Sequence, residues 1–289
     1  MTTAAPVVLI PGRLQNLWRM PAVVNFAGGG LGAGLYVVAA LASDFLPAPA
    51  LTVASWLGPL LVLGGFAAVA TEAGRPLRGA RVLARVATSW MSREVWIGAA
   101  FAALAACEFV IPHSLARLLA LAAAVALVVA QGFIVRRARG LAAWNVPLMP
   151  FTFLVSSLVS GAGGYLLVTL ALGGPPGGRL LGATLAVLVL SALNWRAYLT
   201  WSADPAYVEA TRPLREGATA REVVGIGHVA PFALVAAALV APALAAPAAA
   251  LAGALMIAVQ VRAKAALILA AGQLRPITVA QLRLQRRPS

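Results

Sequence analysis

The sequence has little of what builds covalent or metal-held sites. Its 289 residues include one cysteine, Cys107, which excludes an internal disulfide, a thiolate-held iron–sulfur cluster and a cysteine-rich zinc site. It has only two histidines, and we expect His113 and His228 at opposite ends of two helices, whereas a haem held by two histidines needs both at a similar depth. We therefore expect no haem, and any redox centre held by cysteine must belong to a partner.

Charge is scarce as well. Only 10% of the residues are charged and 62% are hydrophobic, with a mean hydropathy of +0.91, whereas an ordinary soluble domain has about 25% charged residues. The chain is therefore predicted to be an integral membrane protein. Its net charge of +14 would favour nucleic acid in a soluble protein, but here the arginines stand at the ends of apolar runs. The first residues lack the order of a signal peptide, because Arg13 and Arg19 follow the short apolar run, so we expect no cleaved segment.

Long apolar runs dominate the rest. A helix needs about 20 apolar residues to cross the hydrocarbon core, and continuous runs of that kind are the opposite of the alternating pattern of a membrane β-barrel. We predict an all-α integral membrane protein, a single domain over residues 1–289 with eight transmembrane helices in one bundle. The runs lie near residues 23–41, 51–70, 95–111, 115–135, 151–172, 180–199, 226–240 and 248–272.

The basic residues predict the orientation. All 22 lysines and arginines except Arg117 and Arg179 fall on the face of the predicted bundle that also holds the two chain ends. Because short cytoplasmic loops collect lysine and arginine, both termini are predicted to be cytoplasmic. An even number of crossings agrees with this arrangement.

Small and hydroxyl residues mark two helix faces. Gly28 with Gly32, and Gly30 with Gly34, are spaced for close helix packing, and a backbone surface against a flat ligand is the alternative. A second stripe at spacing four serves either packing or a ligand wall; it consists of Thr152, Ser156, Ser160 and Gly164.

Ionisable groups gather toward the cytoplasmic ends of the predicted helices, where they mark functional sites when they face the bundle interior. These are Glu72, Arg93, Glu94, Arg196, Arg262 and Lys264, with Asn194, His228 and Gln260 beside them. Arg262 and Lys264 either extend to the lipid headgroups or form a buried cluster with Glu72 or Glu94 as counter-ion. Glu72 has the further alternative of capping its loop. Glu108 is interpreted as an interfacial residue at the opposite face.

The densest of these segments is "TEAGRPLRGARVLARVATSWMSREVW", residues 71–96. It resembles the loop between helices 2 and 3 of the membrane anchor subunits of dimethyl-sulfoxide-reductase-type molybdoenzymes, a family that includes polysulfide-reductase and NrfD-like anchors. The matching positions are Gly74, Arg75, Pro76, Arg78, Thr88, Ser89, Trp90, Met91, Arg93 and Glu94. The glycine-rich first helix, "WNVPLMPFTFLVSSLVSG", Arg196 and Lys264 extend the resemblance along nearly the whole chain.

This resemblance implies eight helices, no haem, and a quinone pocket (menaquinone or ubiquinone) in a bacterial or archaeal cytoplasmic membrane. It further implies two partners, a ferredoxin-like iron–sulfur subunit and a molybdopterin (Mo/W) catalytic subunit. The relatives have a histidine where this chain has Glu72. The sequence of this loop is also similar to that in the anchor subunits of phenylacetyl-CoA:acceptor oxidoreductases.

Quinone reduction consumes two electrons and two protons, so its site needs an apolar slot, hydrogen-bond donors and a path for protons. The predicted donors and quinone ligands are Glu72, Arg93, Arg196, Arg262 and Lys264. The predicted proton relays are Glu72 and Glu94, and the predicted partner-docking residues are Arg75, Arg78, Arg81 and Arg85. Two other functions stay open, a secondary transporter with a charged path and a purely structural anchor, although the chain shows no convincing internal repeat.

Overall fold

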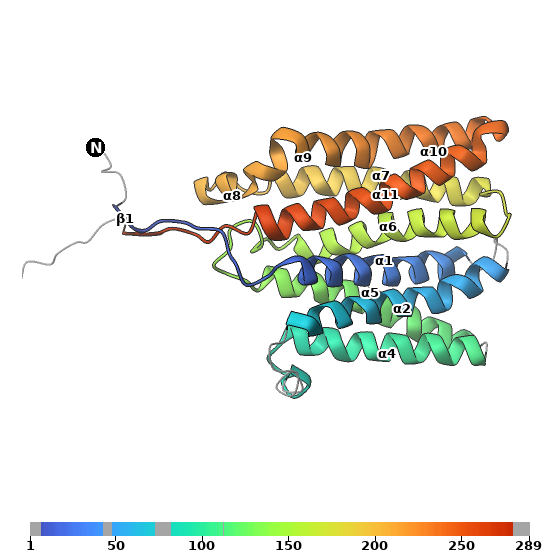
Figure 1. Cartoon of the computed structure of the whole chain (residues 1–289), viewed down its shortest axis with the longest axis horizontal. Helices are drawn as coiled ribbons and strands as arrows, with labels where there is room; N and C mark the ends of the chain where they lie inside the picture. The colour runs from blue at the N-terminus through green and yellow to red at the C-terminus, as the bar shows by residue number, and fades with distance from the viewer. Residues whose placement is uncertain (1–6, 43–47, 73–81, 112, 280–289) are drawn as a thin grey trace, which may run out of the picture.

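The computed structural model of the chain is a bundle of long helices that run side by side (Figure 1). It describes residues 7–42, 48–72, 82–111 and 113–279. Within these ranges, seven helical stretches are long and apolar enough to cross a membrane. The protein is therefore an all-helical, multi-span membrane protein, as its composition predicts.

The helices follow the order of the predicted runs. The long elements are α1 (Met20–Ala42), α2 (Ala48–Glu72), α4 (Trp90–Val110), α5 (Ser114–Arg136), α6 (Met149–Ala171), α7 (Gly178–Leu199), the continuous stretch α9 (Gly217–Arg221), η1 (Glu222–Val229) and α10 (Ala230–Val240), and α11 (Ala245–Ala265) with η3 (Ala266–Ala270). Two short elements connect them, α8 (Pro205–Arg215) and η2 (Pro242–Leu244). Both η1 and η3 are π-helical, a form that occurs frequently at functional sites.

One long helix, α4, is not among the seven apolar stretches. Its 21 residues lie alongside α5 in the bundle (Figure 1), but they include Arg93, Glu94 and Glu108, which lower its hydropathy. The helix begins at Trp90, earlier than the predicted start near residue 95. This shift moves Arg93 and Glu94 from the connecting loop into the first two turns of a bundle helix.

Helix α1 lies in the middle of the bundle, against α2, α5, α6 and α11. Its glycines are the reason that these neighbours approach so closely. A Cβ added at Gly32 would overlap the carbonyl oxygen of Gly58 on α2, and one added at Gly34 would overlap that of Ser157 on α6. Both glycines therefore serve helix packing, one of the two alternatives that the sequence left open.

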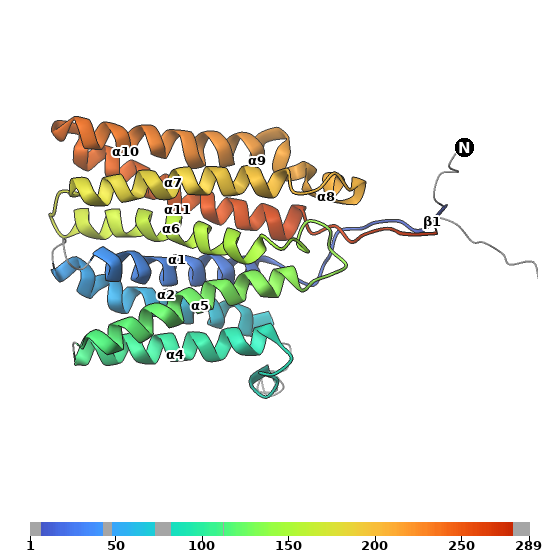
Figure 2. The ribbon, with the colours of Figure 1, turned by 180° about the vertical axis from the view of Figure 1, so that it is seen from behind.

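The two ends of the chain meet in a short ribbon of two strands, which the sequence did not predict. Strand β1 (Val7–Ile10) pairs antiparallel with β2 (Ile277–Val279). Figures 1 and 2 show the ribbon projecting from one end of the helix bundle, and α1 begins and η3 ends at that same end. The first and last described segments therefore leave the bundle together.

Glu108 lies toward the other end of the bundle, where the sequence placed it at the interface. The structure adds that Glu108 is buried there, between α1, α4 and α5. Its Oε2 accepts a hydrogen bond from the Tyr36 hydroxyl at 2.8 Å, and its Oε1 forms an ion pair with Arg117 Nε at 2.7 Å. A buried carboxylate needs such partners, and here they join α1, α4 and α5.

Candidate functional site

A hollow of about 530 Å³ lies at the ribbon end of the bundle, between the start of α4 and the end of α5. Its wall is formed largely by the segment that carries the family resemblance. The residues lining it are Trp18, Ala87, Thr88, Ser89, Trp90, Met91, Arg93, Ile134, Arg137 and Ala138, which we call the signature hollow. Its volume falls within the range of about 300–1,000 Å³ typical of small-molecule sites, and its lining combines large apolar side chains with arginine.

The shape of the signature hollow is held by contacts of Arg93 and Trp90. Arg93 donates to the carbonyl oxygens of Val86 and Ala87, at 2.8 and 2.7 Å, and thereby fixes the preceding loop. Its guanidinium lies 4.5 Å from the centre of the Trp90 ring, which also stacks on Phe133 at 4.3 Å between ring centres. A guanidinium has five N–H donors, so Arg93 keeps donors for a ligand that enters the hollow.

One helical turn deeper lies a buried polar cluster centred on Glu94. Its Oε1 accepts hydrogen bonds from Asn25 Nδ2 at 2.9 Å and from Gln131 Nε2 at 3.0 Å. All three side chains are buried, and the side-chain oxygens of Asn25 and Gln131 have no hydrogen-bond partner in the described part of the chain. Glu94 directly follows Arg93 of the signature hollow in α4, and Gln131 precedes Ile134 of the hollow by about one turn of α5, so the Glu94 cluster lies next to the hollow on its inner side.

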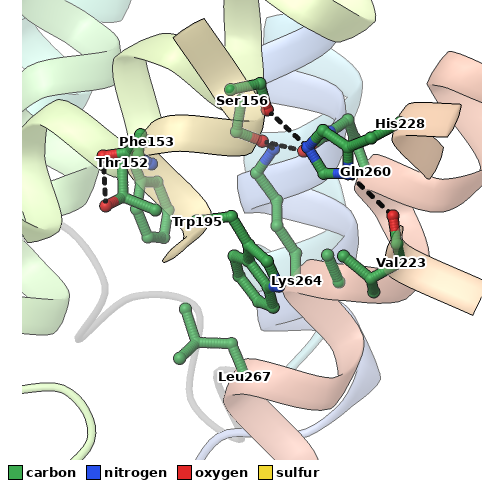
Figure 3. Close-up of a pocket in the computed structure, with 12 residues that line it drawn as sticks. Thr152, Phe153, Ser156, Trp195, Val223, His228, Gln260, Lys264 and Leu267 are labelled. Carbon is green, nitrogen blue, oxygen red and sulfur yellow. Dashed lines mark hydrogen bonds between the residues drawn. The ribbon is translucent and has the colours of Figure 1, made fainter. Parts of the chain in front are cut away.

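A second pocket lies among α6, α7, η1 and α11, on another side of α1 (Figure 3). Lys264, almost completely buried, donates to Ser156 Oγ at 2.6 Å, and Ser156 donates in turn to Gln260 Oε1 at 2.8 Å. The Lys264 amine also lies 5.9 Å from the centre of the Phe153 ring. The free space of this Lys264 pocket is about 30 Å³, which holds one or two water molecules rather than a ring.

His228 completes the Lys264 pocket from the π-helical segment η1. Its Nδ1 donates to the carbonyl oxygen of Val223 at 2.7 Å, since a carbonyl only accepts. Its Nε2 is 3.0 Å from Ser191 Oγ on α7. These two bonds fix the ring beside Gln260, as Figure 3 shows.

The glycine-rich stretch of α1 separates the two polar clusters. A Cβ at Gly29 would overlap the Gln131 amide of the Glu94 cluster. A Cβ at the next residue, Gly30, would lie 3.2 Å from the Lys264 amine. Adjacent glycines on one helix thus make room for polar side chains on two of its faces, so Glu94 and Lys264 belong to different sites.

The remaining predicted site residues are dispersed. Arg262 is exposed and binds Glu222 Oε2 at 2.9 Å and Thr219 Oγ1 at 2.9 Å, so it forms no buried cluster with Lys264. Arg196 and Arg85 are also exposed. Glu72 is the last residue of α2, and its side chain lies outside what the structure describes. Arg75, Arg78 and Arg81 lie outside the described residues as well.

Sequence reasoning did not identify Asn25, Gln131 or Trp18 as site residues. A signal was present for two of them, because Asn25 and Gln131 are single polar residues inside apolar runs, where an unpaired amide is costly. Trp18 precedes the first run and gave no such signal. Within the described residues there is no group of three or more side chains suited to hold a metal ion.

The comparison with known families gives one match. The model of the family described as DMSO reductase anchor subunit (DmsC) matches residues 16–195, more than half of the chain. This range includes the whole signature hollow and the Glu94 cluster, whereas Lys264 lies beyond it. No curated protein matches the sequence.

Proposed function

Since the chain belongs to the family of DMSO reductase anchor subunits, we propose that it holds a molybdoenzyme at the membrane and exchanges electrons between its iron–sulfur subunit and the quinone pool. The membrane-anchor part follows from the family. The exchange with quinone is the part that the signature hollow supports.

The observation that carries this proposal is the position of the signature hollow. It lies at the end of the bundle to which Arg93 and the loop before α4 belong, and the residues that resemble the anchor family form its wall. A quinone head group fits its size and its aromatic walls of Trp18 and Trp90. The free donors of Arg93 would meet a quinone carbonyl oxygen there.

Glu94 would accept protons from the quinol and pass them on. Oxidation of a quinol releases two electrons and two protons, and a carboxyl one turn below the head group is placed to accept one of the protons. The unpaired oxygens of Asn25 and Gln131 are acceptors for water that carries a proton onward. The quinone supplies the redox chemistry, and the chain supplies position and proton transfer.

The Lys264 pocket is the alternative position for the head group. Its donors fit a carbonyl oxygen, but its free space of about 30 Å³ would have to open before a ring entered. The signature hollow needs no such opening. We therefore place the quinone in the hollow, test Lys264 and Glu72 with the variants below, and keep Arg196 and Arg262 as sequence predictions.

We also propose eight membrane crossings with both termini in the cytoplasm. Both ends of the described chain leave the same end of the bundle, which supports an even number of crossings with α4 as the eighth helix beside the seven apolar stretches. The arginine asymmetry places that end in the cytoplasm of a bacterial or archaeal cell. The exposed Arg85, with Arg75, Arg78 and Arg81, would help to dock the partner subunits there. The phenylacetyl-CoA subtype remains a prediction from the wording of the loop.

Purification of the chain together with the subunits encoded beside it tests the function. We expect co-purified iron with molybdenum or tungsten, and iron–sulfur absorbance that bleaches when a quinol is added. A metal-containing complex that ignores quinols would indicate a structural anchor. An isolated chain that moves a substrate across liposomes would indicate a transporter.

A pair of tryptophan variants tests the location. Trp90→Leu removes a wall of the signature hollow, and we expect KM for quinol to rise at least about tenfold, since truncation of an aromatic hot spot costs about 2 kcal/mol or more. Trp56→Leu on α2, which is exposed toward the outside of the bundle, is the matched control and should leave KM unchanged. Equal changes in KM for quinol in the two variants would show that the quinone does not bind in the signature hollow.

A further inference from the structure

The β1–β2 ribbon is tied to the bundle at its base. Gln15 N donates to the carbonyl oxygen of Gly272 at 2.8 Å, and Leu274 N donates to that of Arg13 at 2.8 Å. Arg275 N donates to Gly140 between α5 and α6, also at 2.8 Å. Within the described residues, strands β1 and β2 pair with each other and with no other strand, in a register that shifts between Val8 and Ile10.

The ribbon must lie in water rather than in lipid. A sheet of two strands has an unpaired row of N–H and C=O groups along each outer edge, and the hydrocarbon core does not tolerate such open edges. Figures 1 and 2 agree with this placement, because the ribbon extends away from the ends of the long helices. Lipid therefore does not cover its side chains.

The ribbon nevertheless carries large apolar side chains on its surface. Leu9, Ile10, Leu14 and Ile277 are each more than half exposed, and so is Leu17 at its base. An isolated two-stranded sheet is at best marginally stable in water. Exposed apolar side chains gathered on such a ribbon favour a segment that is completed by a partner.

The charge around the ribbon indicates what kind of partner fits. Arg13 and Arg275 lie at the base of the ribbon, where Arg275 already forms an ion pair with Asp204 at 2.8 Å, and a hollow lined by Arg136, Arg137 and Arg139 lies at the same end of the bundle. A partner that covers this end needs an acidic face to complement these cations. An open strand edge further favours a partner that adds a strand of its own.

We propose that the β1–β2 ribbon is the docking arm for the soluble iron–sulfur subunit, which adds an edge strand to it, covers Leu9, Ile10 and Ile277 with apolar side chains and presents acidic side chains to the neighbouring arginines. This inference rests on the proposed function for the identity of the partner. The inference goes beyond the proposed function by assigning the contact with the iron–sulfur subunit to the paired ends of the chain, in addition to the loop before α4.

The test uses the full chain produced with its partner subunits, and compares two double variants. Leu9→Ser with Ile10→Ser removes apolar side chains of the ribbon, whereas Val110→Ser with Ile111→Ser removes two apolar residues at the opposite end of the bundle that are somewhat more exposed. We expect the ribbon variant to weaken binding of the iron–sulfur subunit about tenfold per residue, from the apolar area no longer buried. The control should bind as the wild type does. Equal binding by wild type and ribbon variant would overturn the proposal.

Hydrogen exchange gives a second measurement that does not depend on a variant. The ribbon amides should become protected in the assembled complex and exchange rapidly in the chain alone. Protection that instead rises with the concentration of the isolated chain would indicate a second copy as the occupant and overturn the assignment. Quinol oxidation separates the two proposals. A complex that assembles through the ribbon but does not oxidise quinol would contradict only the quinone role. A wild-type chain that binds no iron-containing subunit removes both.

Discussion

Replacement of Glu94 by glutamine separates the proton role of this residue from its structural role. Glutamine keeps the shape of the side chain and an oxygen at the position that accepts from Asn25 and Gln131. It removes only the ability to take up and release a proton. The exchange is therefore expected to affect turnover far more than folding.

The magnitudes follow from the two hydrogen bonds. In Glu94→Gln both donors keep an acceptor, so the change in unfolding free energy should stay within about 1–2 kcal/mol. In Glu94→Leu the buried donors of Asn25 and Gln131 lose their partner, at about 1–3 kcal/mol each, so the loss should be about 2–6 kcal/mol. Loss of a general base costs about 10²–10⁴ in rate. We therefore expect kcat of quinol oxidation to fall at least about a hundredfold in Glu94→Gln.

The assay is steady-state oxidation of a quinol by the purified complex, with the thermal unfolding temperature measured on the same samples. Glu108→Gln is the matched control, because Glu108 is a second buried glutamate of α4 that lies far from the signature hollow along the helix. It should lower stability through its bond to Arg117 but leave kcat unchanged. A Glu94→Gln complex with kcat within a factor of two of the wild type would refute the proton role. A raised KM with unchanged kcat would reassign Glu94 to binding.

Three further outcomes are expected. Gly34→Ala should destabilise the bundle by about 1–3 kcal/mol, because its Cβ would overlap the Ser157 carbonyl oxygen. Gly64→Ala is the control and should leave stability unchanged, because the space around Gly64 is open. Equal unfolding temperatures of the two variants would contradict this packing. Glu72→Gln should greatly slow quinone turnover while the complex still assembles, as its place before the family loop predicts, and unchanged quinone kinetics would end that assignment. Lys264→Met should leave kcat for quinol oxidation near the wild-type value, since the Lys264 pocket lies on a different side of α1 from the hollow; a large loss of kcat would move the head group into that pocket.

The sequence by itself determined the class of the protein and the order of its helices. Apolar runs long enough to cross a membrane leave few alternatives to transmembrane helices, since lipid offers the backbone no other hydrogen-bond partners. The arginine asymmetry and the segment from Thr71 to Trp96 likewise are local features, and they pointed to the orientation and to the anchor family without any knowledge of packing.

Only the tertiary structure decided which polar residues share a site. Glu94 and Lys264 are both buried, and the sequence allowed them to be counter-ions, but adjacent glycines of α1 place them on different sides of that helix. Arg262 was an equal candidate and instead binds Glu222 at the surface. Which face a side chain presents depends on the rotation of each helix against its neighbours, and that rotation is set by contacts between residues far apart in the chain. The ribbon of the two chain ends is decided in the same way, because strand pairing across the whole length of a sequence leaves no local pattern.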